Sequence, residues 1–340
     1  MGYLEFVIPI PAERQTASQA IAAILKPQSR VVLTTHVNAD GDGVGSEVAL
    51  WHLLTAHGLK PVIANATGIP DRFDFLIPDG ADQSERAAKE IERADLIWVL
   101  DIGDLGRLGD LGPRVKARGV PVVCVDHHVS PGTLPPGPRL VAPEATATAE
   151  LVFDLAVALG WTVTADVARA LYVGILTDTG GFRFANTAPR ALRVAAALLE
   201  CGVHPEEIYE RVYAGAPEGR VRLTGEVLQT LVVEPEHGLA WVTVPAGALE
   251  RHGATADDLD GIAEFPRSIA GVRLAMLFRP LASGKVKVSF RSVGPVDVAR
   301  LAERFGGGGH VKAAGAAVSG TMAEVQAQVL AAAREHVNGG

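Results

Sequence analysis

The chain contains only two cysteines, Cys124 in an apolar run and Cys201 near the end of a predicted helix. Two isolated cysteines are too few for a disulfide framework and are wrongly spaced for a zinc knuckle, so we expect inert thiols. The sequence also lacks an apolar run long enough to cross a bilayer, and it does not begin with a basic, apolar leader. These absences predict a soluble, cytoplasmic protein.

An excess of positive charge is also missing, since the formal net charge is -8. A protein that coats long nucleic acid is expected to be basic, so this class is disfavoured. Between Phe265 and Gly315, however, nine lysines and arginines face only two acidic residues, Asp297 and Glu303. This local excess of positive charge is compatible with a small anionic ligand or a short piece of nucleic acid.

The first half of the chain alternates short apolar segments with segments of helical length. The apolar segments are 30–36, 60–66, 95–101 and 120–126. Strands as apolar as these are typical of a sheet covered on both faces, which indicates a mostly parallel sheet with helices on either side. The longest linker-like stretch, 130–145, is expected to be an ordered surface connection within this domain.

From about residue 146 to 230 the pattern is helical, and strand patterns return at 237–244, 271–279 and 285–292. A helical pattern, a glycine run and a final helix from about Met322 follow. We therefore predict an α/β protein with three parts: an N-terminal catalytic domain over 1–190, a helical linker over 191–225, and a smaller C-terminal α/β domain over 226–340.

Three of the predicted strands end in a residue that can bind metal: His36, Asp101 and Asp126. Parallel α/β sheets bind ligands at the carboxyl ends of their strands, so these side chains should converge at one edge. Further candidates follow in the adjoining loops or close a later helical pattern: Asp40, Asp42, His127, His128 and Asp178.

The opening segment "HVNADGDGVGS" (36–46), taken alone, is more typical of a solvated turn. A calcium-binding EF-hand loop that started at Asn38 would need glutamate at its twelfth position, where this chain has Ala49. Joint occurrence with "VDHH" (125–128) favours a metal site instead. Four carboxylates and two imidazoles without a thiolate suit manganese first, with zinc, magnesium or cobalt as alternatives. This number of ligands exceeds the need of one ion and indicates two, sharing a carboxylate.

A second cluster is "FGGGGHVKAAG" (305–315), where backbone N–H groups could approach an anion and His310 and Lys312 add donors. A flexible loop is the alternative. The chain has neither a P-loop nor the G-x-G-x-x-G fingerprint, which disfavours dinucleotide dehydrogenases. Arg291 and Ser292 end the strand that leads to this loop, and Arg291 could equally be a charge that protects a sheet edge.

Five segments together, "HVNADGDGVGS", "VLDIGD", "VDHH", "GILTDTGGFRF" and "FGGGGHVKAAG", resemble in order the motifs of the DHH phosphoesterases. The last resembles the glycine-rich motif of the DHH-associated C-terminal domain. The resemblance extends from about residue 17 to 335 and is strongest to the branch of nanoRNases and pAp phosphatases. One departure is Ala39, where the family commonly has a proline that binds no metal.

The resemblance implies that one metal is held by His36, Asp40 and Asp101 and the other by Asp42, Asp101, His127 and Asp178, with Asp101 as the bridge. It implies that His128 faces the substrate as proton donor or phosphate ligand and that Asp126 orients the neighbouring histidine. The candidate catalytic residues are thus Asp101, Asp126 and His128. The candidate substrate contacts are Arg107, Arg183, Arg291, Ser292, Gly307, Gly308, Gly309 and His310.

The expected activity is two-metal hydrolysis of very short oligonucleotides to mononucleotides and removal of phosphate from pAp, with linear or cyclic dinucleotides as further substrates. A clamp on a few nucleotides would explain how an acidic protein acts on nucleic acid, because few phosphates need neutralising. Three alternatives stay open: a pyrophosphatase or exopolyphosphatase, a RecJ-like exonuclease, and a nucleotide sensor without catalysis. The expected partners are short oligonucleotides and nucleotides, with no membrane; a homodimer stays open.

Overall fold

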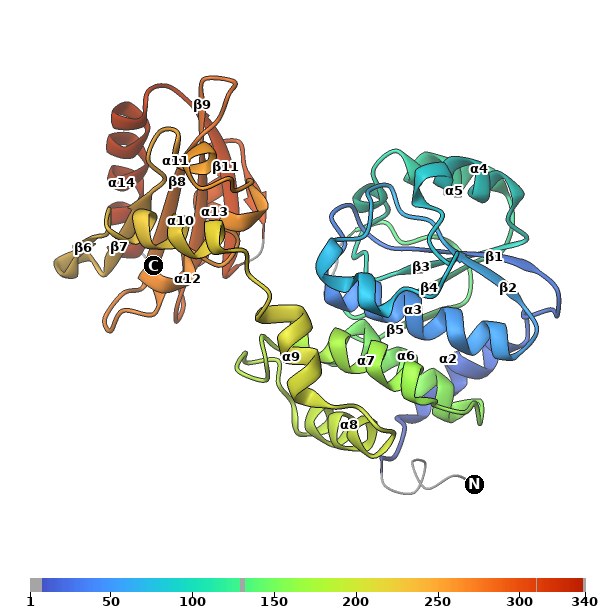
Figure 1. Ribbon diagram of the computed structural model, residues 1–340. Helices are drawn as coiled ribbons and strands as arrows, with labels where there is room; N and C mark the ends of the chain where they lie inside the picture. The colour runs from blue at the N-terminus through green and yellow to red at the C-terminus, as the bar shows by residue number, and fades with distance from the viewer. Residues whose placement is uncertain (1–7, 129–131, 310, 339–340) are drawn as a thin grey trace. The chain divides into compact units, whose positions relative to one another are not determined.

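The computed structural model describes residues 8–128, 132–309 and 311–338 (Figure 1). The chain divides into two compact units, and the division falls between Gly215 and Ala216. The helical segment predicted as a linker, 191–225, spans this division. No helix in the described part of the chain is both long enough and apolar enough to cross a membrane.

The first unit is built on a parallel sheet of five strands in the order β2-β1-β3-β4-β5. Its strands are β1 (Arg30–Thr34), β2 (Lys60–Ile63), β3 (Leu96–Leu100), β4 (Val122–Asp126) and β5 (Arg139–Val141). The predicted parallel α/β sheet is therefore confirmed, with all four predicted strands in it. β5 was not predicted because its three residues lie in the proline-rich stretch that we read as a surface connection.

Helices cover both faces of this sheet, as Figure 1 shows. Trp98 and Leu100 of β3 pack into the larger core with α3, α6 and α7, while Ile97 and Val99 pack on the opposite face with α4 and α5. Successive residues of a strand point to opposite faces, so a strand covered on both must be apolar throughout. The helices are α2 (Ala12–Ala22), α3 (Gly41–Ala56), α4 (Ala87–Arg93), α5 (Leu111–Arg118), α6 (Thr148–Ala158), α7 (Ala165–Asp178), α8 (Pro189–Glu200) and α9 (Pro205–Tyr213), with short 3-10 helices η1 (Asp71–Leu76), η2 (Ser84–Arg86) and η3 (Leu105–Leu108).

The second unit contains a mixed sheet in the order β10-β11-β9-β8-β7-β6, in which only β7 and β8 pair in parallel. The strands are β6 (Val232–Glu234), β7 (Leu239–Thr243), β8 (Leu274–Pro280), β9 (Lys285–Ser292), β10 (Gly308–Gly309) and β11 (Ala313–Ser319). The helices are α10 (Glu218–Leu228), α11 (Ala248–Arg251), α12 (Glu264–Arg267), α13 (Val298–Glu303) and α14 (Met322–Asn338), with 3-10 helices η4 (Pro235–His237) and η5 (Asp257–Leu259). The predicted second α/β region is confirmed.

Candidate metal centre

The candidate side chains gather at the carboxyl ends of β1, β3 and β4. β1 lies between β2 and β3, so the chain runs from β1 to the strand on one side and later continues from the strand on its other side. Open α/β sheets form their binding crevice at the carboxyl ends of the strands where the strand order reverses in this way. His36, Asp101 and His127 follow directly, or within two residues, after these three strands. The sheet therefore brings together residues that are far apart in the sequence.

A first group consists of His36, Asp40 and Asp101, whose ligand atoms lie within 4.8 Å of one another. Nε2 of His36 is 3.7 Å from a carboxylate oxygen of Asp40 and 3.7 Å from one of Asp101. Nδ1 of His36 donates to the carbonyl oxygen of Val37 at 2.9 Å. Nε2 is buried and has no hydrogen-bond partner among the described residues. The nitrogen that could bind a metal is thus the one directed at the carboxylates.

A second group consists of Asp42, His127 and Asp178, and a third set, Asp101, His127 and His128, links it to the first. Nε2 of His127 lies 3.7 Å from Asp42, 3.5 Å from Asp101 and 3.7 Å from Asp178. Nδ1 of His127 faces the carbonyl oxygen of Ala145 at 3.3 Å, which repeats the arrangement seen at His36. Asp101 therefore offers carboxylate oxygens to both groups.

The N-terminus of α6 holds two of these carboxylates from behind. The backbone N–H groups of Thr148 and Ala149 donate to the two oxygens of Asp42 at 2.6 and 2.8 Å, and the hydroxyl of Thr148 donates to Asp101 at 2.9 Å. Free N–H groups at a helix start favour a negative partner. Asp42 and Asp101 are only 1% and 2% exposed, and these hydrogen bonds hold both buried carboxylates in place.

Glycines allow α3 and α7 to approach closely beneath the site. A β-carbon at Gly45 would overlap the carbonyl oxygen of Ala170, and one at Gly174 would lie 2.9 Å from an oxygen of Asp42. The glycines that follow the aspartates of the opening motif therefore belong to a buried helix start and not to a solvated turn. Asp40 is the N-cap of α3, since its side chain accepts from the backbone N–H groups of Asp42 and Gly43.

The carboxylates repel one another strongly. Burial and the negative charges of Asp101, Asp178 and Asp40 raise the pKa of Asp42 well above its usual value. Burial is also the largest cause that raises the pKa of Asp178 to about 6, although His127 opposes it. Burial lowers the pKa of His36, but the carboxylates of Asp101 and Asp40 outweigh it and raise this pKa to about 10. Divalent cations would relieve this repulsion, and the oxygen and imidazole donors fit them.

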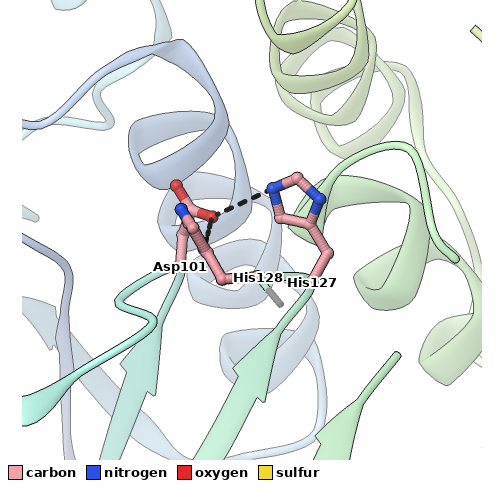
Figure 2. Close-up of side chains that lie close together, drawn as sticks. All are labelled: Asp101, His127 and His128. Atoms are coloured by element: carbon pink, nitrogen blue, oxygen red, sulfur yellow. Dashed lines mark ion pairs between the residues drawn. The ribbon is translucent and has the colours of Figure 1, made fainter. Parts of the chain in front are cut away.

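His128 has different surroundings from the other two histidines. Its Nδ1 lies 2.8 Å from the buried carboxylate of Asp126, and its Nε2 lies 3.1 Å from Nη1 of Arg107. Figure 2 shows His127 and His128 reaching the carboxylate of Asp101 from the loop after β4. Asp126 also accepts from the backbone N–H of Gly103 at 2.7 Å, which fixes its second oxygen. The ring of His128 is thus oriented by Asp126 at the edge of the cluster.

The predicted substrate contacts do not all lie in this cluster. Arg183 is exposed in the turn after α7, where its Nε donates to the carbonyl oxygen of Gly180 at 2.6 Å. Arg291 lies in the second unit on β9 and pairs with Glu264 at 3.1 Å. Ser292 is buried, and its hydroxyl donates to the carbonyl oxygen of Val296 at 2.7 Å. Neighbouring residues of a strand point to opposite faces, so Arg291 and Ser292 cannot present their side chains to one ligand.

Two residues of the glycine run form a short strand where we expected a loop, and the binding of an anion by this run stays a prediction. Gly308 and Gly309 form β10 and pair with Gly315 and Ala314 of β11. A β-carbon at Gly307 would overlap the carbonyl oxygen of Gly315, so close contact with β11 requires glycine there. His310 lies outside the described residues.

Thr148, Asn186 and Asn65 also support the candidate centre, and the sequence reasoning missed all three. Asn186 donates to a carboxylate oxygen of Asp178 at 3.1 Å. Asn65, two residues after β2, accepts from the backbone N–H of Thr35 at 2.9 Å, just before His36. Only Thr148 had a signal in the sequence, because it stands at the start of a predicted helix, where side chains and N–H groups bind carboxylates.

The model of the DHH family N-terminal domain matches residues 30–175, and that of the DHHA1 domain matches 240–339. The bifunctional oligoribonuclease and PAP phosphatase NrnA of Thermus thermophilus is 37% identical to this chain over 321 residues, which cover 93% of each protein. The protein of the same name from Bacillus subtilis is 29% identical over 293 residues, 85% of this chain and 89% of that protein.

Two solved structures resemble this chain over most of its length. An exopolyphosphatase-related protein from Bacteroides fragilis superimposes with a TM-score of 0.89 at 29% identity, over 94% of this chain and 96% of that one. RecJ of Thermus thermophilus, solved in complex with Mn2+, gives a TM-score of 0.57 at 18% identity over 98% of this chain and 56% of that one, which shows a shared fold. The resemblance drawn from the five sequence motifs is confirmed: this chain belongs to the DHH family of phosphoesterases.

Proposed function

We propose that this chain hydrolyses the phosphodiester bonds of very short oligonucleotides and removes phosphate from pAp, using two divalent cations. The observation that carries the proposal is the pair of ligand groups at the carboxyl edge of the sheet, with Asp101 a member of the first and 3.5 Å from His127 of the second. The relatives named as oligoribonucleases and PAP phosphatases, which match the chain over nearly its whole length, supply the substrate class.

In this proposal His36, Asp40 and Asp101 would hold one cation, and Asp42, Asp101, His127 and Asp178 would hold the other. Mn2+ is our first choice for both, because the site offers oxygen and imidazole donors and no thiolate. When bound, the two cations would supply positive charge and Lewis acidity at the reacting phosphate. Asp101 would be a ligand of both cations, and the hydroxyl of Thr148 holds its carboxylate through a hydrogen bond.

His128 and Arg107 would meet the substrate at the open side of this centre. Asp126 holds Nδ1 of His128, which leaves Nε2 as the ring nitrogen directed toward Arg107. We assign to Nε2 of His128 the contact with the phosphate or with the ribose oxygen that leaves, and to Arg107 the stabilisation of negative charge on the phosphoryl group. Asp126 would keep the ring oriented during the reaction.

The decisive experiment compares hydrolysis of pAp, dinucleotides, oligonucleotides of three to twenty residues, pyrophosphate and polyphosphate in Mn2+. We expect the highest kcat/KM for pAp and for the shortest oligonucleotides. Asp101→Asn should abolish turnover and should also remove Mn2+ binding in a calorimetric titration. Asp166→Asn, a change on the exposed start of α7, should leave both unchanged. Turnover that survives in Asp101→Asn would contradict the assignment of the shared ligand.

One observation favours a second candidate. The structure from Bacteroides fragilis, which matches nearly the whole chain, is described as an exopolyphosphatase-related protein. Polyphosphate or pyrophosphate hydrolysis would need the same ligand groups but no contact with a base or a ribose. If either compound proved by far the best substrate in the same panel, this second function would replace the first.

A further inference from the structure

One short segment, 145–149, supports the residues that would hold the second cation. The segment leads into α6, and it makes direct hydrogen bonds with three of the four proposed ligands of that cation, namely Asp42, Asp101 and His127. The fourth ligand, Asp178, is the last residue of α7. Its carboxylate is joined to the same segment through an intermediate side chain, that of Asn186.

Asn186 and Thr146 form a two-way link between the end of α7 and the start of α6. Nδ2 of Asn186 lies 3.1 Å from a carboxylate oxygen of Asp178, 3.1 Å from its carbonyl oxygen and 3.2 Å from the carbonyl oxygen of Thr146. All three neighbours are acceptors, so the amide must turn its nitrogen, and not its oxygen, toward them. The hydroxyl of Thr146 donates in return to the carbonyl oxygen of Asn186 at 2.9 Å.

The carboxylate of Asp178 depends on this link more than the buried carboxylates depend on any single contact. Asp42 accepts two backbone N–H groups and its side chain is 1% exposed, whereas the side chain of Asp178 is 26% exposed. Among the described residues, Asn186 provides the only hydrogen bond to the carboxylate of Asp178, since Nε2 of His127 is 3.7 Å away. Without Asn186, rotation of its side chain could carry this carboxylate away from the other ligands.

A buried ion pair fixes the segment to which Asn186 is bound. Glu150 accepts from the backbone N–H of Thr146 at 3.1 Å and from Nη1 of Arg14 at 2.7 Å, and both Glu150 and Arg14 are buried. A glutamate in the first turn of a helix that accepts from an N–H ahead of the helix resembles half of a capping box. The carbonyl oxygen of Thr146 is therefore a firm point of attachment for the amide of Asn186.

We propose that Asn186 is a positioning residue that prepares Asp178 for the second cation. The inference rests on the proposed function, in which Asp178 is a ligand of that cation alone. His36 and Asp40, which would belong to the first cation alone, are held by backbone groups of residues 37–43. Loss of Asn186 should therefore weaken one of the two cation sites and spare the other.

The test titrates the full chain with Mn2+ in a calorimeter, without substrate, and compares the parent with Asn186→Ala. The parent should bind two ions. The variant should bind the first within about threefold of the parent and the second about tenfold more weakly, because residues that support metal ligands alter affinity by about 10- to 100-fold. We expect the lower end of this range since Asn186 is exposed and water can partly replace its amide.

Electron paramagnetic resonance gives a readout that a general loss of stability would not produce. Two Mn2+ ions that share a ligand are magnetically coupled, and single ions are not. At the Mn2+ concentration that just fills both sites of the parent, the signal of the coupled pair should give way to that of single ions in Asn186→Ala.

Thr187→Val is the matched control, because it changes the next residue, whose buried hydroxyl has no hydrogen-bond partner among the described residues. It should bind both ions like the parent. Thr146→Val removes the hydroxyl bond to Asn186 and should weaken the second ion less than Asn186→Ala does. Asp40→Asn keeps an N-cap for α3 and should weaken the first ion instead. Combined with Asn186→Ala, it should leave neither ion tightly bound.

Equal weakening of both ions in Asn186→Ala, or parental binding of the second ion, would overturn the inference. It would also be overturned by a parent chain that binds fewer than two ions, or by a combined variant that keeps the ion bound by Asp40→Asn. If the parent binds two ions and Asn186→Ala loses one, but the parent hydrolyses none of the nucleotides, the proposed function fails and the inference stands.

Discussion

Replacing Thr148 by valine tests whether the start of α6 prepares the carboxylates for cations. The change keeps the shape of the side chain and the backbone N–H that donates to Asp42, and it removes only the 2.9 Å hydrogen bond from the hydroxyl to Asp101. Thr148 is fully buried, so water cannot replace the lost donor without rearrangement. We therefore expect a specific effect on the shared ligand.

The size of this effect follows from the charge on Asp101. A hydrogen bond to a charged group contributes about 1.5–3 kcal/mol, and residues that support metal ligands typically alter affinity by about 10- to 100-fold. We expect Thr148→Val to weaken Mn2+ binding by about tenfold or more in a calorimetric titration. Thr148→Ser retains the hydroxyl and should bind Mn2+ within about threefold of the parent chain.

Two results would refute the reasoning. Parental Mn2+ affinity in Thr148→Val would show that the hydroxyl does not prepare Asp101, whatever happened to turnover. Equal weakening in the valine and serine variants would show that packing of the methyl group, and not the hydrogen bond, matters at this position. Urea denaturation of both variants in EDTA separates a change in folding stability from a change in metal affinity.

Glu47 is buried, and burial raises its pKa to about 8. The folded state therefore favours the protonated carboxyl, so its contribution to the free energy of unfolding should be complete below about pH 4.5 and be lost as the pH rises toward 8. Denaturation of Glu47→Gln between pH 5 and 8.5 should show less loss of stability at high pH than the parent; parallel curves would contradict this. Gly45→Ala would overlap the carbonyl oxygen of Ala170 and should cost about 2 kcal/mol or more, whereas Gly225→Ala, in an open position on α10, should be neutral or stabilise by up to about 1 kcal/mol; equal thermal shifts would refute the packing argument. Arg14→Met leaves two buried carboxylates short of a partner and should lower the free energy of unfolding by about 3 kcal/mol, measured in urea; an unchanged midpoint would contradict it.

Periodicity and position in the sequence predicted the first unit well. β1, β3 and β4 are continuous apolar runs, and each is followed closely by candidate ligands, so the rule for parallel sheets sufficed to predict that His36, Asp101 and His127 converge. The sequence could not reveal the hydrogen bonds that the start of α6 donates to the carboxylates. The bond from the backbone N–H of Thr148 to Asp42 joins residues 106 positions apart.

The second unit was harder to predict from the sequence. β11 consists mainly of alanine and glycine, which are not typical of strands, and its pairing with β9 depends on tertiary contacts. Glycines 308 and 309 were read as a loop for the same reason. Arg291 and Ser292 were both predicted as substrate contacts, and their adjacency in a strand places their side chains on opposite faces, which the sequence pattern alone did not make evident.

If Asp101 is a ligand of both cations, as we propose, a substitution at this one position would affect both ligand groups at once. Asp101 also has a left-handed backbone, with φ of 55°, a conformation that asparagine and glycine tolerate better than other residues. A descendant that abandoned catalysis while keeping its fold would therefore be expected to carry asparagine or glycine at this position. Asparagine or glycine at position 101 should then mark a copy of the protein that has lost catalysis.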